Sequence, residues 1–326
     1  MTHAISVHAY GGPEVLTWEP IEIGRPAPGQ IRVRHSAIGV NYLDVYHRTG
    51  LYPEPLPLTP GVEAAGVVEE VGPGVDGLRV GDRIAYVGGP LGAYSQARLL
   101  PADRALALPD WLADETAAAM MLRGMTAWAL LRRVHPVQAG DTILVHAAAG
   151  GMGLLLSQWA RSLGATVIGT VSSDDKAALA RRHGCAHVIV SSREQVVARV
   201  LQITDGRKLP VVYDSIGKDS FAASLDCLQP RGLLVSYGQS SGPVPPLDIR
   251  LLATKGSLVL TRPSLFHFIG QRRELEEAAA ELLAVVASGA VEVVVGQRYP
   301  LADAAQAHRE LQARRTTGST LLLPHA

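Results

Sequence analysis

Residues 142–176 constrain the fold of this chain of 326 residues more than any other segment does. A short apolar run, Thr142 to His146, leads into a turn of small residues. A long segment with helical apolar periodicity and a second β-rich run over 166–171 follow. Strand, glycine turn, helix and strand in this order are the context of a dinucleotide-binding fingerprint. The segment therefore predicts the first unit of a doubly wound parallel sheet, and an ordinary βα turn is the weaker alternative.

The turn itself reads A-x-G-x-x-G, with Ala148 in the place of the first glycine. Gly150 would let the backbone approach a pyrophosphate, and Gly153 would let the helix pack closely on the strand. N–H groups at the start of a helix have no acceptor within the helix and can bind phosphate oxygens. The residues predicted to bind the cofactor in this turn are Gly150, Gly151, Met152 and Gly153.

The end of the second strand indicates which dinucleotide is bound. NAD sites usually carry Asp or Glu there, which binds the ribose hydroxyls. This chain has Ser172 and Ser173 instead, with Lys176 one turn later, and two hydroxyls with a cation suit a 2′-phosphate. Asp174 and Asp175 argue the other way, unless they only cap the following helix, where acids are common. We therefore expect NADPH rather than NADH.

Composition and charge narrow the class of protein. The chain is 47% hydrophobic, which is enough for one large domain or two, and its formal net charge is zero. No block of Lys or Arg suggests a nucleic-acid or membrane surface. Two cysteines fit a reducing compartment, and neither a signal sequence nor an apolar run of membrane-spanning length is visible. These features predict a cytoplasmic protein that binds neither nucleic acid nor membrane.

From Asp141 onward, strand and helix patterns alternate, which predicts an α/β Rossmann fold with a parallel sheet and right-handed crossovers. The predicted strands cover 142–146, 166–171, 187–190, 211–214, 233–237 and 257–261. The predicted helices between them cover 153–163, 174–183, 193–203 and 219–228.

The segments on either side of this region follow different patterns. The first 100 residues are β-rich, and residues 114–133 predict one helix, or two with a break near Gly124. An amphipathic helix is predicted over 272–288. The runs 291–295 and 320–323 read as strands, and because they lie beyond the sixth strand we expect them to return to the first domain.

Several segments, in the same order along the chain, resemble the zinc-free quinone oxidoreductases of the medium-chain dehydrogenase/reductase group, the zeta-crystallin-like enzymes. The segments are GGPEVL (11–16), NYLDVY (41–46), PGVEAAGVVEEVG (60–72), HAAAGGMG (146–153), GLLVSYGQSSG (232–242), TRPSL (261–265) and RRTTGSTLL (314–322). The resemblance covers essentially the whole chain.

The resemblance implies a GroES-like, β-rich catalytic domain built from residues 1–123 and 264–326, with a Rossmann NADP(H)-binding domain over 124–263 inserted into it. In this family NADPH lies between the two domains. The members are usually homodimers that join their sheets at the sixth Rossmann strand, here about 257–261.

The resemblance also implies further site residues. Asn41 and Tyr46 would position nicotinamide and substrate, and Asp44 of the same segment would belong to the cofactor site. The alternative for this segment is loop packing, with Asp44 capping a short helix. The remaining residues implied to contact the cofactor are Thr126, Ser191, Gly238, Ser240, Arg262, Ser264, Arg314 and Gly318. Close relatives often place a tyrosine near position 191. Its absence here implies either a weaker preference for NADPH or compensation by Ser191 and Arg193.

Two other patterns, metal-binding cysteines and a hydrolase elbow, would indicate different chemistry. The chain has only Cys185 and Cys227, so it cannot supply the cysteine sets of the zinc-dependent relatives, and we expect no metal. Residues 238–242 match G-x-S-x-G, the hydrolase nucleophile elbow, but the prolines over 243–246 exclude the helix that this elbow requires.

The reaction expected from these features is hydride transfer from NADPH to a quinone without a metal. The nicotinamide carries the chemistry, so no acid–base side chain is required, and Asn41 and Tyr46 are assigned positioning roles. An NADPH-dependent reductase of alkenals and enones on the same fold is the nearest alternative. The alternative from another class is a non-catalytic protein that uses NADPH as a ligand or sensor.

Overall fold

The computed structural model describes residues 2–326 and divides into two compact units. One unit comprises Met1–Arg123 and Val293–Ala326, and the other comprises Gly124–Glu292. The second unit contains all six strands that the sequence predicts for the Rossmann domain. Residues 264–292 also group with it, whereas the expected domain boundary lies at 264.

The second unit is built on a six-stranded sheet in which every neighbouring pair is parallel. Its strands are β8 (Thr142–Val145), β9 (Thr166–Val171), β10 (Cys185–Val190), β11 (Leu209–Asp214), β12 (Leu228–Ser236) and β13 (Val259–Thr261). They lie in the order β10-β9-β8-β11-β12-β13, so the strand order reverses beside β8. This is the doubly wound arrangement that the sequence predicts, and its ligand site is expected at the carboxyl ends of the strands beside the reversal.

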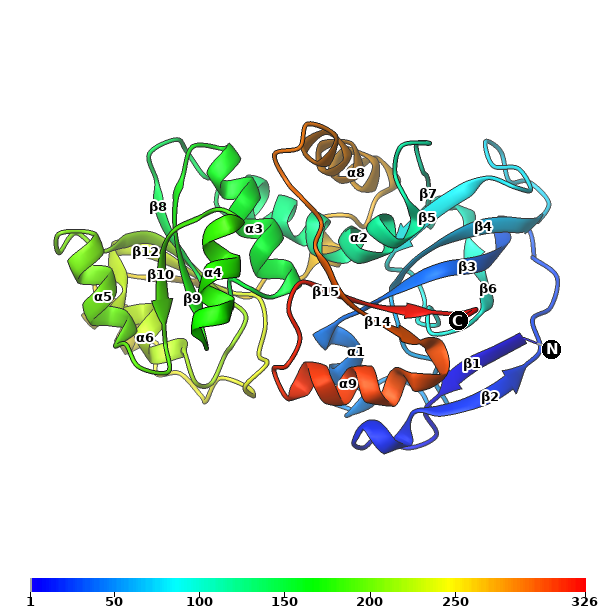
Figure 1. The fold of residues 1–326 in the computed structure, drawn as a ribbon, viewed down its shortest axis with the longest axis horizontal. Coiled ribbons are helices and arrows are strands. Elements are labelled where there is room, and N and C mark those ends of the chain that lie inside the picture. Colours follow the sequence, from blue (N-terminus) through cyan, green and yellow to red (C-terminus); the bar gives the residue numbers. More distant parts are fainter. Residues whose placement is uncertain (1) are drawn as a thin grey trace. The chain divides into compact units, whose positions relative to one another are not determined.

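Helices connect these strands, and the predicted ones are present within a few residues of their expected bounds. The connecting helices are α3 (Gly151–Ser162), α4 (Asp174–Arg182), α5 (Val196–Ile203), α6 (Phe221–Asp226) and α7 (Arg250–Thr254), of which α7 is not predicted. The predicted helix α8 (Arg272–Ala287) follows β13. Figure 1 shows α5 and α6 side by side. The strands contribute aliphatic side chains such as Leu144, Ile168 and Val212 to a common buried core.

Of the two alternatives for residues 114–133, the single helix is confirmed, and there is no break near Gly124. Helix α2 (Asp114–Trp128) passes through Gly124 and continues as a π-helical segment over Ala129–Val134. Gly124 is needed for packing, because a Cβ atom there would lie 2.6 Å from Cδ2 of Leu282 in α8. The glycine lets α8 approach α2 without bending it.

Side-chain contacts explain why α8 groups with the second unit. Trp128 Nε1 donates a hydrogen bond to Glu281 Oε1 at 2.9 Å, and Arg132 pairs with the same carboxylate at 3.2 Å. Arg133 pairs with Glu277 one turn earlier in α8. These contacts, with the packing of Leu282 on Gly124, tie α8 to the end of α2.

The first unit is β-rich, as predicted, and holds a seven-stranded mixed sheet and a separate two-stranded one. The larger sheet contains β3 (Gln30–Val40), β4 (Glu63–Val71), β5 (Arg83–Val87), β6 (Ala97–Pro101), β7 (Ala105–Ala107), β14 (Val295–Pro300) and β15 (Ser319–Leu323). The smaller sheet pairs β1 (Thr2–Ser6) with β2 (Thr17–Ile21). Two helices of this unit, α1 (Tyr42–Arg48) and α9 (Ala304–Gln312), matter for the site.

The return of the C-terminal strands to this unit is confirmed, because β15 pairs antiparallel with β3. The predicted position of the first of them is wrong: β14 begins at Val295, not at Val291. The backbone N–H and C=O of Glu292 are instead bonded to the side chain of Gln158, each at 3.0 Å. Glu292 therefore cannot use these groups for strand pairing. Among residues 2–326, no helix is both long and apolar enough to cross a membrane.

Candidate functional site

The turn after β8 has the geometry of the fingerprint. Ala147 takes a left-handed conformation, with φ of 52°, and reverses the chain. The N–H of Ala148 then donates to the carbonyl of Thr170 in β9 at 2.9 Å, and Gly150 N–H donates to Ala147 at 2.9 Å. Gly150 is the N-cap of α3, which begins at Gly151. The predicted turn is thus closed on itself and held against the neighbouring strand β9.

The two fingerprint glycines differ in what their surroundings demand. A Cβ atom at Gly153 would lie 2.6 Å from Cα of Ala148 and would also collide with the carbonyl of Ala147. Close helix–strand packing therefore requires glycine at 153, as predicted. A Cβ atom at Gly150 would meet only one atom within 4 Å, the Ala147 oxygen at 3.3 Å. The fold itself leaves room for a side chain at Gly150, which is where a pyrophosphate would need the space.

The start of α3 fits the phosphates of a dinucleotide. The first N–H groups of a helix have no acceptor within it, and here they belong to Gly151, Met152 and Gly153. The positive end of the helix dipole adds attraction for an anion. The four residues predicted for this turn, counting Gly150, therefore lie together and can hold a pyrophosphate.

A buried polar network next to this turn supports it. His146, directly after β8, bonds the hydroxyls of Thr170 and Ser224 through its two ring nitrogens, each at 2.9 Å. Ser224 in turn donates to the carboxylate of Asp214 at 2.7 Å. Burial lowers the pKa of His146, so the ring is neutral at physiological pH. The network joins the ends of β8, β9 and β11.

The residues predicted to select the cofactor surround the end of β9. Ser172 is exposed, whereas Ser173 is the N-cap of α4, and its hydroxyl accepts the N–H of Lys176 at 3.5 Å. Asp174 and Asp175 lie in the first turn of α4 and are not its cap, and Asp174 pairs with Arg193. This pairing offsets one of the two negative charges that argue against a 2′-phosphate.

Ser191 lies beside this group. Its hydroxyl and its N–H both donate to the carbonyl of Val171, at 3.1 and 2.9 Å. The structure thus brings the predicted residues Ser172, Ser173, Lys176 and Ser191 to the carboxyl ends of β9 and β10.

The loop after β12 also lies at the carboxyl edge of the sheet. A Cβ atom at Gly238 would lie 2.7 Å from the carbonyl of Ser215, and Ser240 N–H donates to that carbonyl at 3.1 Å. Arg262 donates to the carbonyls of Ser236 and Gly238 at 3.0 and 2.8 Å. Ser264 follows as the residue before a short 3₁₀ turn. No helix follows Ser240 before α7, in agreement with the exclusion of the hydrolase elbow.

Thr126 is half-buried within α2 and belongs to the second unit. Arg314 and Gly318 belong to the first unit, in the segment between α9 and β15. Burial raises the pKa of Tyr42 in α1, against the lowering effect of the Arg314 charge. Gly318 has φ of 60°, and a Cβ atom there would lie 2.5 Å from the carbonyl of Val294. Its glycine is thus required by the backbone alone.

In the first unit, Asn41 and Asp44 form the start of α1. Asn41 is the N-cap, and its backbone N–H donates to Asp44 Oδ2 at 2.8 Å. The Asn41 side chain donates from Nδ2 to Oε1 of Glu63 at 2.7 Å. Since a carboxylate can only accept here, this bond fixes the orientation of the amide. The Asn41 amide oxygen therefore points away from Glu63.

Two buried acids with their cations surround Asn41. Glu63 accepts the N–H of Leu122 at 2.6 Å and lies 3.7 Å from Arg123. Burial raises the pKa of Glu63, against the effect of the Arg123 charge. Asp44 is completely buried, and burial raises its pKa to about 7, against the lowering effect of its bonds to Asn41 and Tyr94. The Asp44 side chain contacts its own unit, so any effect on a ligand is exerted through Asn41.

Tyr46 belongs to a group of aromatic rings at α1. Its ring centroid lies 6.1 Å from that of Tyr42 and 5.2 Å from that of Tyr52, which meets it edge-on. His47 meets the other side of Tyr52 at 6.3 Å. Tyr46 is largely buried, with 8% of its surface exposed. This packing holds the ring in one orientation.

Sequence reasoning missed Glu63, Tyr94 and His308. Glu63 follows Val62 and precedes a run of small residues in a buried strand, and a single acid in such a run was the available signal. Tyr94 and His308 lie far apart in sequence and meet only in the fold, with Tyr94 Oη 2.9 Å from His308 Nε2. No spacing pattern could have paired them.

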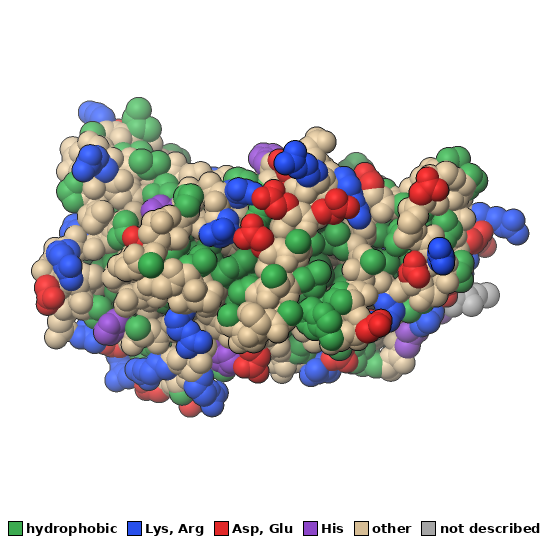
Figure 2. Space-filling view, turned by 90° about the horizontal axis from the view of Figure 1, so that it is seen from above, with side chains coloured by type: hydrophobic (Ala, Val, Ile, Leu, Met, Phe, Trp, Pro, Cys, Tyr) green, Lys and Arg blue, Asp and Glu red, His purple; other side chains and the backbone are tan. Residues whose placement is uncertain are grey.

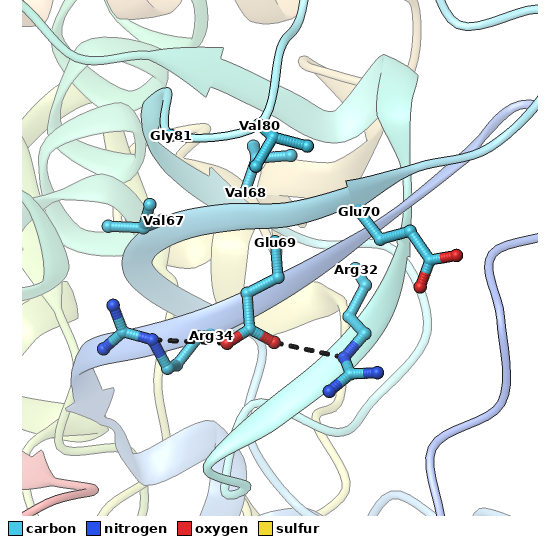
Figure 3. Close-up of a pocket in the computed structure, with 8 residues that line it drawn as sticks. All are labelled: Arg32, Arg34, Val67, Val68, Glu69, Glu70, Val80 and Gly81. Carbon is cyan, nitrogen blue, oxygen red and sulfur yellow. Dashed lines mark hydrogen bonds and ion pairs between the residues drawn. The ribbon is translucent and has the colours of Figure 1, made fainter.

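A groove of about 440 Å³ lies elsewhere in the first unit and contains none of the predicted site residues. Figure 3 shows Glu69 between Arg34 and Arg32, which it meets at 3.3 and 3.1 Å. These charges largely satisfy one another. Among residues 2–326, no three His, Cys, Asp or Glu side chains gather in a way that could hold a metal ion.

Comparisons with known proteins agree with this geometry. The family model described as an alcohol dehydrogenase GroES-like domain matches residues 27–110, and the one described as a zinc-binding dehydrogenase matches residues 151–295. A quinone oxidoreductase of Pseudomonas aeruginosa is 51% identical, over 99% of this chain and 100% of the relative. A 2-haloacrylate reductase of Burkholderia is 48% identical, over 100% of both chains.

Solved structures show the same similarity. The structure of Escherichia coli quinone oxidoreductase complexed with NADPH matches with a TM-score of 0.97 and 47% identity, over 99% of this chain and 100% of the other. Relatives this similar over their whole length, together with two domain models matched in the expected order, identify the family. The chain belongs to the quinone oxidoreductase family of the medium-chain dehydrogenases/reductases.

Proposed function

We propose that this protein is an NADPH-dependent quinone reductase. The observation that carries the proposal is the turn at 147–153, which offers helix N–H groups and the space beside Gly150 at the reversal point of a parallel sheet. A quinone oxidoreductase relative at 47% identity has been solved in complex with NADPH, which supports the choice of cofactor.

The cofactor contacts in this proposal follow the predicted residues. Gly150, Gly151, Met152 and Gly153 bind the pyrophosphate, and Ser172, Ser173, Lys176 and Ser191 bind the 2′-phosphate end. Arg193 is tied to Asp174 and neutralises it, so its contribution is indirect. The other residues proposed to contact the cofactor or shape its site are Thr126, Gly238, Ser240, Arg262, Ser264, Arg314 and Gly318.

In the proposed mechanism, NADPH supplies the hydride when it is bound. One N–H of the Asn41 amide is engaged by Glu63, which fixes the amide and leaves its second N–H and its oxygen to orient nicotinamide or substrate. Tyr46 orients a quinone oxygen, and its packed ring limits the number of orientations. Asp44 holds the backbone of Asn41. These residues orient the reactants, which is the main contribution a protein makes to such a reaction.

A second candidate function is the reduction of conjugated alkenes. The 2-haloacrylate reductase relative favours it, since its named substrate class contains a carbon–carbon double bond conjugated to a carboxylate. The same orienting residues would serve both reactions. The two candidates differ only in which acceptor fits beside the nicotinamide.

The test is the oxidation of NADPH with a panel of acceptors: benzoquinone, phenanthrenequinone, an enone and a 2-haloacrylate, each repeated with NADH. We expect rapid oxidation with the quinones and a preference for NADPH. Turnover only with the enone or the haloacrylate would replace the first function with the second. Tight NADPH binding without turnover on any acceptor would point to a sensor or another binding role.

We also propose a homodimer formed at the edge of the Rossmann sheet. Val259 in β13 is 52% exposed, and Ile249 beside α7 is 76% exposed, so both offer apolar surface near that edge.

Basic and acidic side chains are interspersed on the face drawn in Figure 2, which suits a small-molecule substrate better than a nucleic acid. Cys185 and Cys227 are buried free thiols, in keeping with a proposed cytoplasmic location.

A further inference from the structure

A series of buried hydrogen bonds runs from the last residue of α1, through α9, back to the start of α1. Arg48 Nη1 lies 3.2 Å from Nδ1 of His308, and His308 Nε2 lies 2.9 Å from the hydroxyl of Tyr94. The Tyr94 hydroxyl lies 3.0 Å from Asp44 Oδ2, which also accepts the N–H of Asn41. All four side chains of this chain, Arg48, His308, Tyr94 and Asp44, are essentially inaccessible to solvent.

The donors and acceptors in this series of hydrogen bonds can be assigned in only one consistent way. A guanidinium can only donate, so Nδ1 of His308 must accept from Arg48. A neutral imidazole then carries its hydrogen at Nε2 and donates it to the Tyr94 oxygen, and Tyr94 donates its own hydrogen to Asp44. Burial lowers the pKa of His308 to about 3, with a further lowering from Arg48, so the ring is neutral. The donors therefore converge on the Asp44 carboxylate.

At its far end this chain controls Asn41. Asp44 binds the Asn41 backbone, while Glu63, paired with Arg123, binds the Asn41 side chain. Backbone and amide are thus held by two separate buried groups. Loss of the Tyr94 hydroxyl would leave Asp44 Oδ2 with one donor fewer, and Asp44 Oδ1 is already without a partner among residues 2–326. An Asp44 carboxyl group held by fewer hydrogen bonds would be more mobile and would hold the first turn of α1 less firmly.

We propose that Tyr94 and His308 are positioning residues for the reduction of the acceptor: with Arg48 they form a directed hydrogen-bond chain that holds Asp44 and thereby fixes Asn41 and the first turn of α1. The inference rests on the proposed function, because it concerns the helix that carries Asn41 and Tyr46. Neither Tyr94 nor His308 is proposed to touch the substrate or the cofactor.

The protein contains a second buried Tyr–His pair, which offers a matched control for the test. Tyr86 is as buried as Tyr94, and its hydroxyl lies 3.0 Å from Nε2 of another buried histidine, His35. The His35 Nδ1 lies 2.7 Å from the carbonyl of Ser95, so this second pair ends on a backbone oxygen and does not reach α1. Tyr94→Phe and Tyr86→Phe each remove one hydroxyl from a Tyr–His pair. They should destabilise the protein to a similar extent.

Two readouts are measured on both variants: amide hydrogen exchange of peptides covering 41–48 in the cofactor-free protein, and steady-state turnover with a quinone. Tyr94→Phe should speed exchange in that segment and lower kcat roughly tenfold, the size expected for a lost bond to a buried carboxylate, while the Kd for NADPH stays within about threefold. Tyr86→Phe should leave both the exchange of 41–48 and kcat at wild-type values.

Substitutions at His308 provide the rescue. A glutamine can accept from Arg48 and donate to Tyr94, so His308→Gln should retain most of the turnover, whereas His308→Leu should behave like Tyr94→Phe. Equal effects of Tyr94→Phe and Tyr86→Phe on exchange and kcat would overturn the proposal, and so would wild-type exchange in Tyr94→Phe. If the wild-type protein reduces no acceptor, the proposed function fails, yet the exchange arm still decides whether this chain positions α1.

Discussion

At the scale of single residues, Gly150 and Gly153 should respond differently to the same change. Gly153→Ala places a Cβ atom 2.6 Å from Cα of Ala148, and we expect a loss of about 1–3 kcal/mol in the free energy of unfolding. Gly150→Ala has an ordinary φ of −77° and little around its Cβ, so stability should change by less than about 1 kcal/mol. Urea denaturation measures both effects.

NADPH binding should depend more on Gly150 than on Gly153, the reverse of their order in stability. In Gly150→Ala the new methyl group occupies the space proposed for the pyrophosphate, so the Kd should rise at least about tenfold, equivalent to one lost phosphate bond. The measurement is the quenching or enhancement of nicotinamide fluorescence on titration. A Gly150→Ala variant that binds NADPH as tightly as the wild type would place the pyrophosphate elsewhere.

Tyr46 is expected to assist the reaction without being essential to it. Tyr46→Phe keeps the ring that packs against Tyr42 and Tyr52 and removes only the hydroxyl. Because protons for the hydroquinone can also come from water, kcat should fall by about tenfold or less, or about 1.4 kcal/mol in activation free energy. A loss of several thousandfold in steady-state turnover would make Tyr46 the catalytic acid instead.

At the scale of elements, the sequence predicts those whose cause is local. The strand–turn–helix of β8 and α3 follows from an apolar run, three glycines and helical periodicity within a few residues. The start of β14 was placed wrongly because Gln158, distant in sequence, binds the backbone of Glu292. The choice between one helix and two at Gly124 stayed open for a similar reason, since the packing of the distant Leu282 explains that glycine.

The same distinction applies to the candidate site. Gly153 was predictable because its neighbours Ala147 and Ala148 lie nearby in sequence. The bonds that hold Asn41 come from Glu63 and, through Asp44, from Tyr94, which lie 22 and 53 positions away in the sequence. Which buried acid meets which donor is decided by the pairing of strands and the docking of α9, and a single sequence carries no local signal for it.

The edge strand β13 carries a testable prediction about assembly. It pairs with β12 on one side, and among residues 2–326 no strand pairs with its other side. Val259→Lys would place a charge on that edge, a known way of blocking strand pairing between chains, while costing little stability because Val259 is half-exposed. We expect the wild type to elute as a dimer and this variant as a monomer in size-exclusion chromatography with light scattering.

A matched substitution controls for the added charge. Val80 lies in the first unit and is 66% exposed, so Val80→Lys makes the same change at an exposed valine of the unit that does not contain β13. It should leave the dimer intact. A monomeric wild type, or a Val259→Lys variant that remains dimeric, would reject the proposed interface.

At the scale of the whole molecule, buried ionisable groups should make stability depend on pH in opposite directions. Burial lowers the pKa values of His35 and His308 to about 3, so the unfolded chain takes up their protons first and stability falls as the pH drops below the ordinary histidine value. Asp44 acts oppositely. Burial raises its pKa to about 7, so its contribution is fully present below the ordinary carboxyl value and is lost as the pH rises toward and through 7.

His35 lets one of these contributions be isolated. A glutamine at this position can donate to the Ser95 carbonyl and accept from the Tyr86 hydroxyl, so His35→Gln removes the titrating group while its two contacts can be kept. Between about pH 6 and pH 4, the wild type should lose about 1.4 kcal/mol more per pH unit than the variant in the free energy of unfolding, the slope for one proton. Urea denaturation across that range measures the difference. Parallel curves for the two proteins would mean that His35 is already protonated in the folded state. A protonated ring would donate to the Ser95 carbonyl and also to the Tyr86 oxygen, which is possible only if Tyr86 turns its own hydrogen away.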